Sequence, residues 1–306
     1  MARCFVTHDL PGPALGRLRA VHEVDLWTEP LPPTPDQLAE CAADAEGLLS
    51  MLVDRIDDAL LDRCPKLRAI ANYAVGYDNI DLAATRARGI LVGNTPDVLT
   101  DATADLTFAL ILAIARRLGD AAASVKDGEW GTWEPDNYLG YDVHGATLGI
   151  IGLGRIGHAV ARRAAGFDMT VIHAGRDPAG LDDLLARADF VSVHCPLTPE
   201  TRHLIDADAL FKMRPTAMLI NTARGPIVDQ DALREALVDG TIAGAALDVT
   251  DPEPLPPDDP LMSAPNLIVV PHIGSATHQA REGMATLAVE NLLAALDGKP
   301  MPHEVV

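Results

Sequence analysis

The stretch ATLGIIGLGRIGHAVARRAAG, residues 146–166, decides the fold of this chain. Its first part, ATLGII, is an apolar run typical of a buried strand, and its last part, HAVARRAAG, has the composition of a helix. Between them Gly152, Gly154 and Gly157 form a G-x-G-x-x-G pattern. Between a strand and a helix, such glycines allow a tight turn, a close backbone approach to a pyrophosphate, and helix–strand packing. The stretch therefore predicts a dinucleotide-binding unit.

Similar strand-like runs recur along the chain with helix-length gaps between them. They are CFVTH (4–8), VDLW (24–27), GLLSMLV (47–53), LRAIANYA (67–74), MTVIHA (169–174), FVSVHC (190–195), AMLIN (217–221), AGAALDV (243–249) and NLIVVPH (266–272). This alternation predicts an α/β protein with two doubly wound parallel-sheet (Rossmann-like) domains around a central cleft.

Two long apolar segments predict how the chain passes between these domains. Residues 103–117 should form a buried helix that leads into the second domain, with Arg116 and Arg117 at its negative end. Residues 279–296 are amphipathic and should return the chain to the first domain. We therefore expect a discontinuous first domain, residues 1–97 and 282–306, and a dinucleotide-binding domain, residues 98–281.

Composition narrows the class of protein further. The chain has 306 residues, of which 48% are hydrophobic, and a formal net charge of −20. This charge argues against nucleic acid or anionic membranes as partners. No run reaches the roughly 18 apolar residues of a membrane span, and the N-terminus lacks the apolar core of a signal peptide. The four cysteines, Cys4, Cys41, Cys64 and Cys195, are scattered without metal-ligand spacing, which predicts a reduced, cytoplasmic protein, with disulfides as the alternative. The histidines and acids do not group at ligand spacing either, so we expect no metal requirement.

The sequence TVIHAGRDP, residues 170–178, bears on which dinucleotide is bound. About 20 residues after the glycine loop, NAD sites carry an acidic residue for the ribose 2′-hydroxyl. Here Gly175 occupies that place and Arg176 follows it. Arginine pairs well with a phosphate, so NADPH is the predicted cofactor and NADH a weaker one. Asp177 leaves open the alternative that a carboxylate still reaches the ribose.

Three further strand ends carry polar residues suited to oxoacid chemistry. NTARGPIVD (221–229) contains Arg224, DVTDPEP (248–254) contains Glu253, and PHIGSAT (271–277) contains His272. Together they resemble the D-isomer-specific 2-hydroxyacid dehydrogenase family, most closely its glyoxylate/hydroxypyruvate reductase branch. The resemblance continues in SMLVDRID (50–57), NYAVGYDNID (72–81), GNTPDVLTDATADLTFALILA (93–113) and GEWGTWEPDNYLGYDVHG (128–145), and so covers nearly the whole chain.

The resemblance implies a reductase that converts glyoxylate to glycolate, or hydroxypyruvate to D-glycerate. Arg224 would bind the substrate carboxylate and polarise its carbonyl. His272 would give a proton to the carbonyl oxygen as hydride arrives from the nicotinamide. Glu253 would bond the other imidazole nitrogen and favour the protonated ring.

The resemblance also implies the remaining binding residues. The first domain would bind the substrate, through Leu52 and the backbone N–H groups of Val75 and Gly76. Trp133 would reach the active site of a neighbouring subunit, in a homodimer joined through the nucleotide domains. The expected dinucleotide contacts, with Asp248 receiving the nicotinamide carboxamide, are Thr103, Gly152, Gly154, Arg155, Ile156, Gly157, Gly175, Arg176, Cys195, Pro196, Thr201, Thr222, Ala223, Asp248, His272 and Gly274.

Two alternatives share this architecture. One is another D-2-hydroxyacid dehydrogenase, of the D-lactate or phosphoglycerate type. The TWEP loop, the AVG turn and the Gly175-Arg176 pair argue against it. The other is a dinucleotide-sensing regulatory protein similar to the C-terminal-binding corepressors, which keep the same trio of residues. We expect no long disordered extension after GKPMPHEVV, which would argue against this second alternative.

Replacing Arg176 by alanine should raise the Michaelis constant for NADPH far more than that for NADH. The reason is that only NADPH carries the 2′-phosphate with which the guanidinium would pair. Initial rates with each dinucleotide measure both constants. Equal increases for the two would show that Arg176 does not recognise the phosphate.

Overall fold

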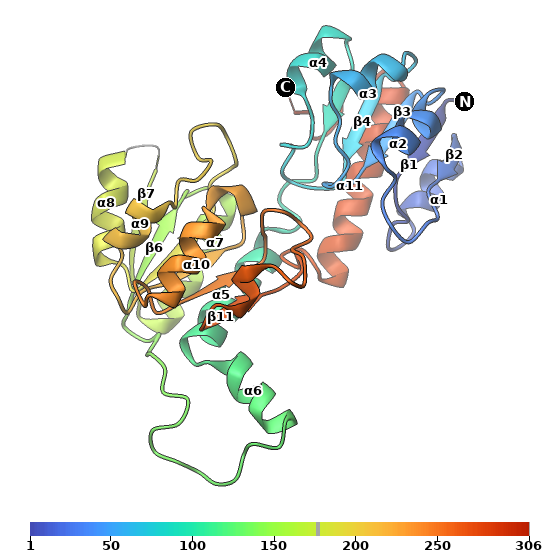
Figure 1. Cartoon of the computed structure of the whole chain (residues 1–306). Helices are drawn as coiled ribbons and strands as arrows, with labels where there is room; N and C mark the ends of the chain where they lie inside the picture. Colours follow the sequence, from blue (N-terminus) through green and yellow to red (C-terminus); the bar gives the residue numbers. More distant parts are fainter. Residues whose placement is uncertain (176–177, 306) are drawn as a thin grey trace. The chain divides into compact units, whose positions relative to one another are not determined.

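The computed structural model describes residues 1–175 and 178–305 of the chain. Contacts divide the protein into two compact units (Figure 1). Unit 1 comprises Met1–Leu99 and Ala276–Val306, and unit 2 comprises Thr100–Ser275. From the sequence, the chain was predicted to pass between the two domains after residues 97 and 281. In the structure it passes between the two units after residues 99 and 275.

Unit 1 contains a five-stranded parallel sheet in the order β2-β1-β3-β4-β5. Its strands are β1 (Arg3–Val6), β2 (Glu23–Leu26), β3 (Gly47–Ser50), β4 (Ala69–Asn72) and β5 (Leu91–Gly93). Its helices are α1 (Ala14–Arg19), α2 (Pro35–Ala42), α3 (Asp58–Arg63), α4 (Leu82–Ala87) and α11 (His278–Leu296). The sequence predicted the first four strands but not β5, whose three residues are too few to show a periodic pattern.

Helices cover both faces of this sheet. On one face Phe5, Leu48 and Ile70 are buried against the apolar sides of α2, α3 and α4. On the other face lies α11, the last long helix, which contacts β3, β4, β5 and α1 (Figure 1). The close approach of α11 to the sheet depends on glycine, because a Cβ at Gly47 would lie 3.0 Å from a methyl carbon of Leu292.

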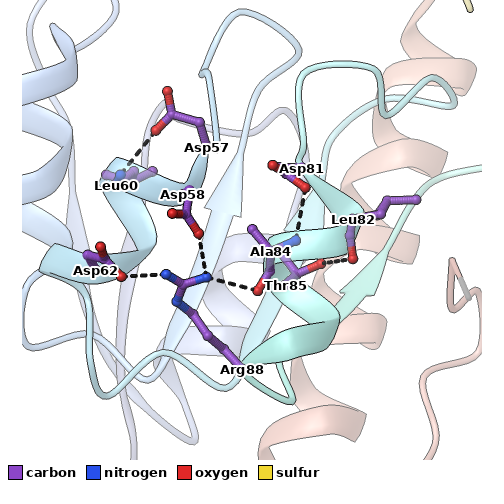
Figure 2. A network of polar contacts seen from close by, with 9 residues as sticks. All are labelled: Asp57, Asp58, Leu60, Asp62, Asp81, Leu82, Ala84, Thr85 and Arg88. Carbon is purple, nitrogen blue, oxygen red and sulfur yellow. Dashed lines mark hydrogen bonds and ion pairs between the residues drawn. The ribbon is translucent and has the colours of Figure 1, made fainter.

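Polar contacts fix the two helices that follow β3 and β4 (Figure 2). Asp57 accepts a hydrogen bond from the Leu60 N–H and so caps α3, and Asp81 caps α4 in the same way through the Ala84 N–H. Arg88, just after α4, pairs with Asp58 at 2.8 Å and with Asp62 on α3. The side chains of Asp58 and Asp62 are mostly exposed, so these ion pairs orient the two helices but add little to the stability of the fold.

Unit 2 contains a six-stranded parallel sheet in the order β11-β10-β9-β8-β6-β7. Its strands are β6 (Thr147–Ile151), β7 (Thr170–Ala174), β8 (Phe190–Val193), β9 (Met218–Asn221), β10 (Gly244–Leu247) and β11 (Leu267–Val269). Its helices are α5 (Thr100–Ala115), α6 (Leu118–Lys126), α7 (Arg155–Ala164), α8 (Pro178–Arg187), α9 (Ala207–Lys212) and α10 (Gln230–Val238). The predicted α/β class with two parallel sheets is confirmed.

Alternate residues of these strands enter two separate cores. Leu148 and Ile150 of β6 pack in the core beneath α5 and α7. Ile151, one residue later, packs in the core beneath α8, α9 and α10. Side chains alternate across a strand, so a sheet covered on both faces needs apolar residues at every position. This explains the unbroken apolar runs in the sequence.

The helix predicted over residues 103–117 is α5, which ends at Ala115. The helix thus ends two residues earlier than predicted, and Arg116 and Arg117 directly follow its C-terminal end. Arg117 has a left-handed backbone (φ 49°) and leads directly into α6. Figure 1 shows α6 and the loop after it extending from the body of unit 2. Among the described residues, no helix is both long and apolar enough to cross a membrane.

Candidate active site

The glycine loop follows β6 at the point where the strand order of unit 2 reverses. From β6 the chain moves to β7 on one side and then to β8 on the other. In open parallel sheets, ligands bind in the crevice beyond the strand ends at such a switch point. A Cβ added at Gly152 would lie 2.5 Å from the backbone nitrogen of Cys195, so the loops after β6 and β8 meet there.

The three glycines of this loop have different surroundings. Gly152 has φ +93°, a conformation that favours glycine. A Cβ at Gly157 would lie 2.4 Å from the Gly152 carbonyl oxygen, so this residue keeps α7 close to β6. A Cβ at Gly154 would meet no protein atom within 4 Å. Packing therefore explains Gly152 and Gly157, while the glycine at 154 leaves room for a group that is not protein.

Helix α7 begins directly after Gly154 and presents its N-terminus at this open space. Its first helical hydrogen bond runs from the His158 N–H to the Gly154 carbonyl. The N–H groups of Arg155, Ile156 and Gly157 precede that bond, at the positive end of the helix dipole. These donors and the open position at Gly154 fit a dinucleotide pyrophosphate.

The residue that should recognise the ribose follows β7. Gly175 is exposed, and a Cβ there would have no protein neighbour within 4 Å. Arg176 and Asp177 lie outside the described residues. The choice between NADPH and NADH therefore stays a prediction from the sequence.

The loop after β8 is closed by a threonine. Thr201 donates from Oγ1 to the Pro196 carbonyl at 2.7 Å and accepts from the Thr198 N–H at 2.8 Å. Burial raises the pKa of the Cys195 thiol to about 11, so this cysteine is neutral near pH 7. The predicted contacts Cys195, Pro196 and Thr201 thus share one ordered loop beside Gly152.

Asn221, the last residue of β9, holds the turn that carries Arg224. Its side chain accepts from the Ala223 N–H at 3.0 Å and donates to the Arg224 carbonyl at 2.9 Å. Thr222 lies in the same turn and shares a hydrogen bond of 3.1 Å with Thr107 of α5. Asn221 is fully buried, and a buried asparagine at a strand end needs backbone partners. This role was not predicted from the sequence, which shows only that a polar residue ends the apolar run AMLIN.

Glu253 and His272 are brought together from the loops after β10 and β11. Glu253 Oε1 lies 2.5 Å from His272 Nδ1. Their side chains are 31% and 22% exposed, respectively, so both reach the surface of the unit. His272 has φ +51°, an uncommon left-handed conformation for a residue with a side chain. Because Nδ1 is engaged by the carboxylate, Nε2 is the nitrogen left to face a substrate.

Asp248 fixes the loop that carries His272. The backbone carbonyl of Asp248 accepts from the His272 N–H at 2.9 Å. Its carboxylate oxygens accept from Ile273 N–H at 2.6 Å and from Gly274 N–H at 2.8 Å. Thr103 of α5 donates to the Gly274 carbonyl at 3.2 Å. Burial raises the pKa of Asp248, while these N–H donors oppose that rise.

The remaining predicted residues lie elsewhere in the chain. Leu52 follows β3 and the pair Val75 and Gly76 follows β4, all in unit 1 and all partly exposed. Trp133 lies in the loop after α6 and is 80% exposed. Their roles stay predictions.

In the described residues, three features thus lie at one edge of the sheet of unit 2. They are the glycine loop that fits a dinucleotide, the hydrogen-bonded His272–Glu253 pair, and the Arg224 turn that Asn221 holds in place. The described part of the chain contains no group of three or more His, Cys, Asp or Glu side chains placed to bind a metal ion.

Comparison with known proteins agrees with this geometry. Residues 108–274 match the family described as D-isomer specific 2-hydroxyacid dehydrogenase, NAD binding domain. A glyoxylate reductase of Korarchaeum cryptofilum is 47% identical over 99% of this chain and 95% of its own. The TT0316 protein of Thermus thermophilus superposes with a TM-score of 0.94 at 50% identity, covering 99% and 100% of the two chains. An NADPH-dependent glyoxylate/hydroxypyruvate reductase of Sinorhizobium meliloti, in complex with NADP and malonate, has a TM-score of 0.88 at 34% identity over 100% and 97%.

His194, between β8 and Cys195, should make stability depend on pH. Its imidazole lies 2.8 Å from Ser192 Oγ, and burial lowers the pKa of His194 from 6.5 to about 4. Between pH 6.5 and about pH 4, His194 binds a proton in the unfolded chain but not in the folded chain. Stability present above pH 6.5 is therefore lost as the pH falls towards 4, by at most about 3 kcal/mol.

His194→Gln should reduce this loss, measured as the free energy of unfolding in denaturant at about pH 7 and pH 4.5. His144→Asn is the control, because the His144 side chain is 76% exposed and its replacement should leave the difference unchanged. An equal loss in the wild type and in His194→Gln would contradict the assignment.

Proposed function

The chain belongs to the D-isomer specific 2-hydroxyacid dehydrogenase family, and we propose that it reduces small 2-oxoacids with NADPH as the preferred cofactor. Glyoxylate and hydroxypyruvate are the proposed substrates. The names of the relatives from Korarchaeum cryptofilum and Sinorhizobium meliloti support this choice. The observation that carries the proposal is the His272–Glu253 pair at the same sheet edge as a loop that fits a dinucleotide.

His272 is the proposed proton donor. With Nδ1 held by Glu253 at 2.5 Å, the Nε2–H of the protonated ring can donate to the carbonyl oxygen of the substrate. Glu253 stabilises the positive ring before transfer, and Asp248 holds the backbone on which the ring is carried. As the carbonyl carbon gains a hydride and its oxygen gains this proton, the 2-oxoacid becomes a 2-hydroxyacid.

The residues around the glycine loop are proposed to hold the dinucleotide, which supplies the hydride when bound. The N–H groups at the start of α7 would bind its pyrophosphate, and Gly154 would leave room for it. Thr103, Thr222 and Asp248 are the proposed neighbours of its nicotinamide end. Arg176 is the proposed ligand of a 2′-phosphate.

We propose that a positively charged side chain and backbone N–H groups bind the carboxylate of the substrate. Arg224 offers a planar, permanently charged fork whose backbone is held by Asn221. The backbone N–H groups of Val75 and Gly76 are the further proposed donors, with Leu52 beside them. A fixed positive charge at the carbonyl also stabilises the negative charge that grows on its oxygen during reduction.

The working assembly is proposed to be a homodimer. The loop between α6 and β6 exposes Trp130 and Trp133 by 71% and 80%, a large apolar area for a surface loop. A second copy that covered this loop through its nucleotide unit would bury both rings. We propose that Trp133 then helps to shape the neighbouring substrate pocket.

The function is tested by initial rates with glyoxylate and with hydroxypyruvate, each with NADPH and NADH. The expected result is turnover of both acids and a lower Michaelis constant for NADPH. A preference for NADH would leave the proposed reductase activity in place and would indicate that Asp177 binds the ribose. Absence of turnover with both acids and both dinucleotides would overturn the proposal.

His272→Asn should bind NADPH with unchanged affinity and lose turnover by a factor of about 100 or more, because a positioned general acid contributes that much. Dinucleotide fluorescence titration measures the affinity, and the steady-state rate measures the turnover. His144→Asn, at an exposed histidine of the same unit, should match the wild type in both. A His272→Asn enzyme with wild-type turnover would refute the proton-donor role.

Light scattering should give a mass of about 65 kDa, twice the chain mass of 32.5 kDa. Trp133→Ser should raise the Michaelis constant for the 2-oxoacid, while Trp130→Ser should leave it near the wild-type value. A monomeric wild type, or equal effects of the two substitutions, would contradict the assigned role of Trp133.

A further inference from the structure

Glu253 lies in a loop whose middle is exposed. Val249, shortly after β10, is buried, and Leu255 packs against the core beneath α8, α9 and α10. Between these two residues, Pro252, Glu253 and Pro254 are exposed. Apolar packing therefore fixes the two ends of the loop, while the residues around the carboxylate depend on polar contacts for their position.

Thr250 holds the peptide group through which the chain enters Glu253. The Thr250 side chain is buried, and its Oγ1 donates to the Pro252 carbonyl at 2.8 Å. The Pro252 carbonyl and the Glu253 N–H belong to one planar peptide group. The hydroxyl of Thr250 thus sets the direction in which the chain enters Glu253, as hydroxyls often do in turns.

Gln230, the first residue of α10, holds the loop from a neighbouring helix. Its Oε1 accepts from the Asp251 N–H at 3.2 Å. The helix itself is fixed, because Asp229 caps it through the Ala232 N–H at 3.1 Å and Leu233 is fully buried in the core. Gln230 therefore reaches the loop from a fixed position.

The peptide group between Thr250 and Asp251 also rests on the turn after β9. A Cβ added at Gly225 would lie 1.9 Å from the Thr250 carbonyl oxygen and 2.8 Å from the Asp251 nitrogen. A glycine is needed for so close an approach. The peptide group is thus in contact with Gly225 and hydrogen-bonded to Gln230, so the turn after β9 and the loop after β10 are joined at this point.

We propose that Thr250 and Gln230 are positioning residues that hold the Glu253 carboxylate against the imidazole of the proton donor. This inference rests on the proposed function. Glu253 Oε1 lies 2.5 Å from His272 Nδ1, and a misplacement of about 1 Å can lower an enzymatic rate about 100-fold. Both residues act through Glu253 and do not touch the substrate. Their effect should therefore fall on the chemical step and spare the binding of both ligands.

Thr250→Val keeps the shape of the side chain and removes the hydroxyl, whereas Thr250→Ser keeps the hydroxyl. In stopped-flow mixing of the NADPH-loaded enzyme with glyoxylate, Thr250→Val should lower the single-turnover rate about tenfold or more, because the loop loses its hold on Glu253. Thr250→Ser should stay near the wild-type rate. Gln230→Met, which lacks the acceptor for the Asp251 N–H, should also lower the rate. The dissociation constants for NADPH and for oxamate, an unreactive analogue of a 2-oxoacid, should not change.

A double substitution tests whether the two residues act through Glu253. Glu253→Ala removes the carboxylate that they would position. Adding Thr250→Val or Gln230→Met to Glu253→Ala should therefore slow the single turnover no further, because substitutions that act through one group are not additive. A further slowing equal to that seen in the wild-type background would overturn the inference.

Thr85→Val is the matched control, since it removes the hydrogen bond of a buried threonine on α4 in unit 1. It should lower the melting temperature and leave the single-turnover rate unchanged. A wild-type rate in Thr250→Val or in Gln230→Met, or a Thr250→Ser enzyme as slow as Thr250→Val, would overturn the inference.

The wild-type enzyme separates two kinds of failure. A wild type that reduces no 2-oxoacid overturns the proposed function together with this inference. An active wild type with unaffected variants overturns this inference alone.

Discussion

All the loops that carry the candidate site of unit 2 leave one edge of a single parallel sheet. Parallel strands end on the same side, so residues separated by more than 100 positions along the chain lie at the same edge of the sheet. Gly152 after β6, Arg224 after β9 and His272 after β11 are positioned by this constraint. The two apolar cores beneath the helices keep the strands parallel and the edge intact.

Short polar side chains at strand ends then convert this edge into defined loops. Asn221 bonds the turn of Arg224, and Asp248 bonds the loop of His272. Asn72 and Asn94 do the same for the turn after β4 in unit 1. The reason is common to all four. Where the ladder of a sheet stops, buried backbone groups lose their partners, and an amide or carboxylate on a short side chain can replace them.

The sequence was informative where the chemistry is local. Glycines between a strand and a helix, and apolar runs buried on both faces, predicted the nucleotide unit and its sheet. The three-residue strand β5 was missed, because so short a run has no period, and the helix predicted to Arg117 ends at Ala115. The backbone at Arg117 turns left-handed to begin α6, a change that composition does not reveal.

The sequence by itself determined the α/β class and the glycine loop, because each of these depends on residue type and spacing, and its resemblance to the family predicted the roles of Arg224, Glu253 and His272. Only the tertiary structure decided that Glu253 meets His272 Nδ1, that Asp248 holds the next two N–H groups, and that Asn94 bonds the Val75 carbonyl. These contacts join loops from different strands. Their distances depend on how the strands pair and how the helices pack, which no local pattern encodes.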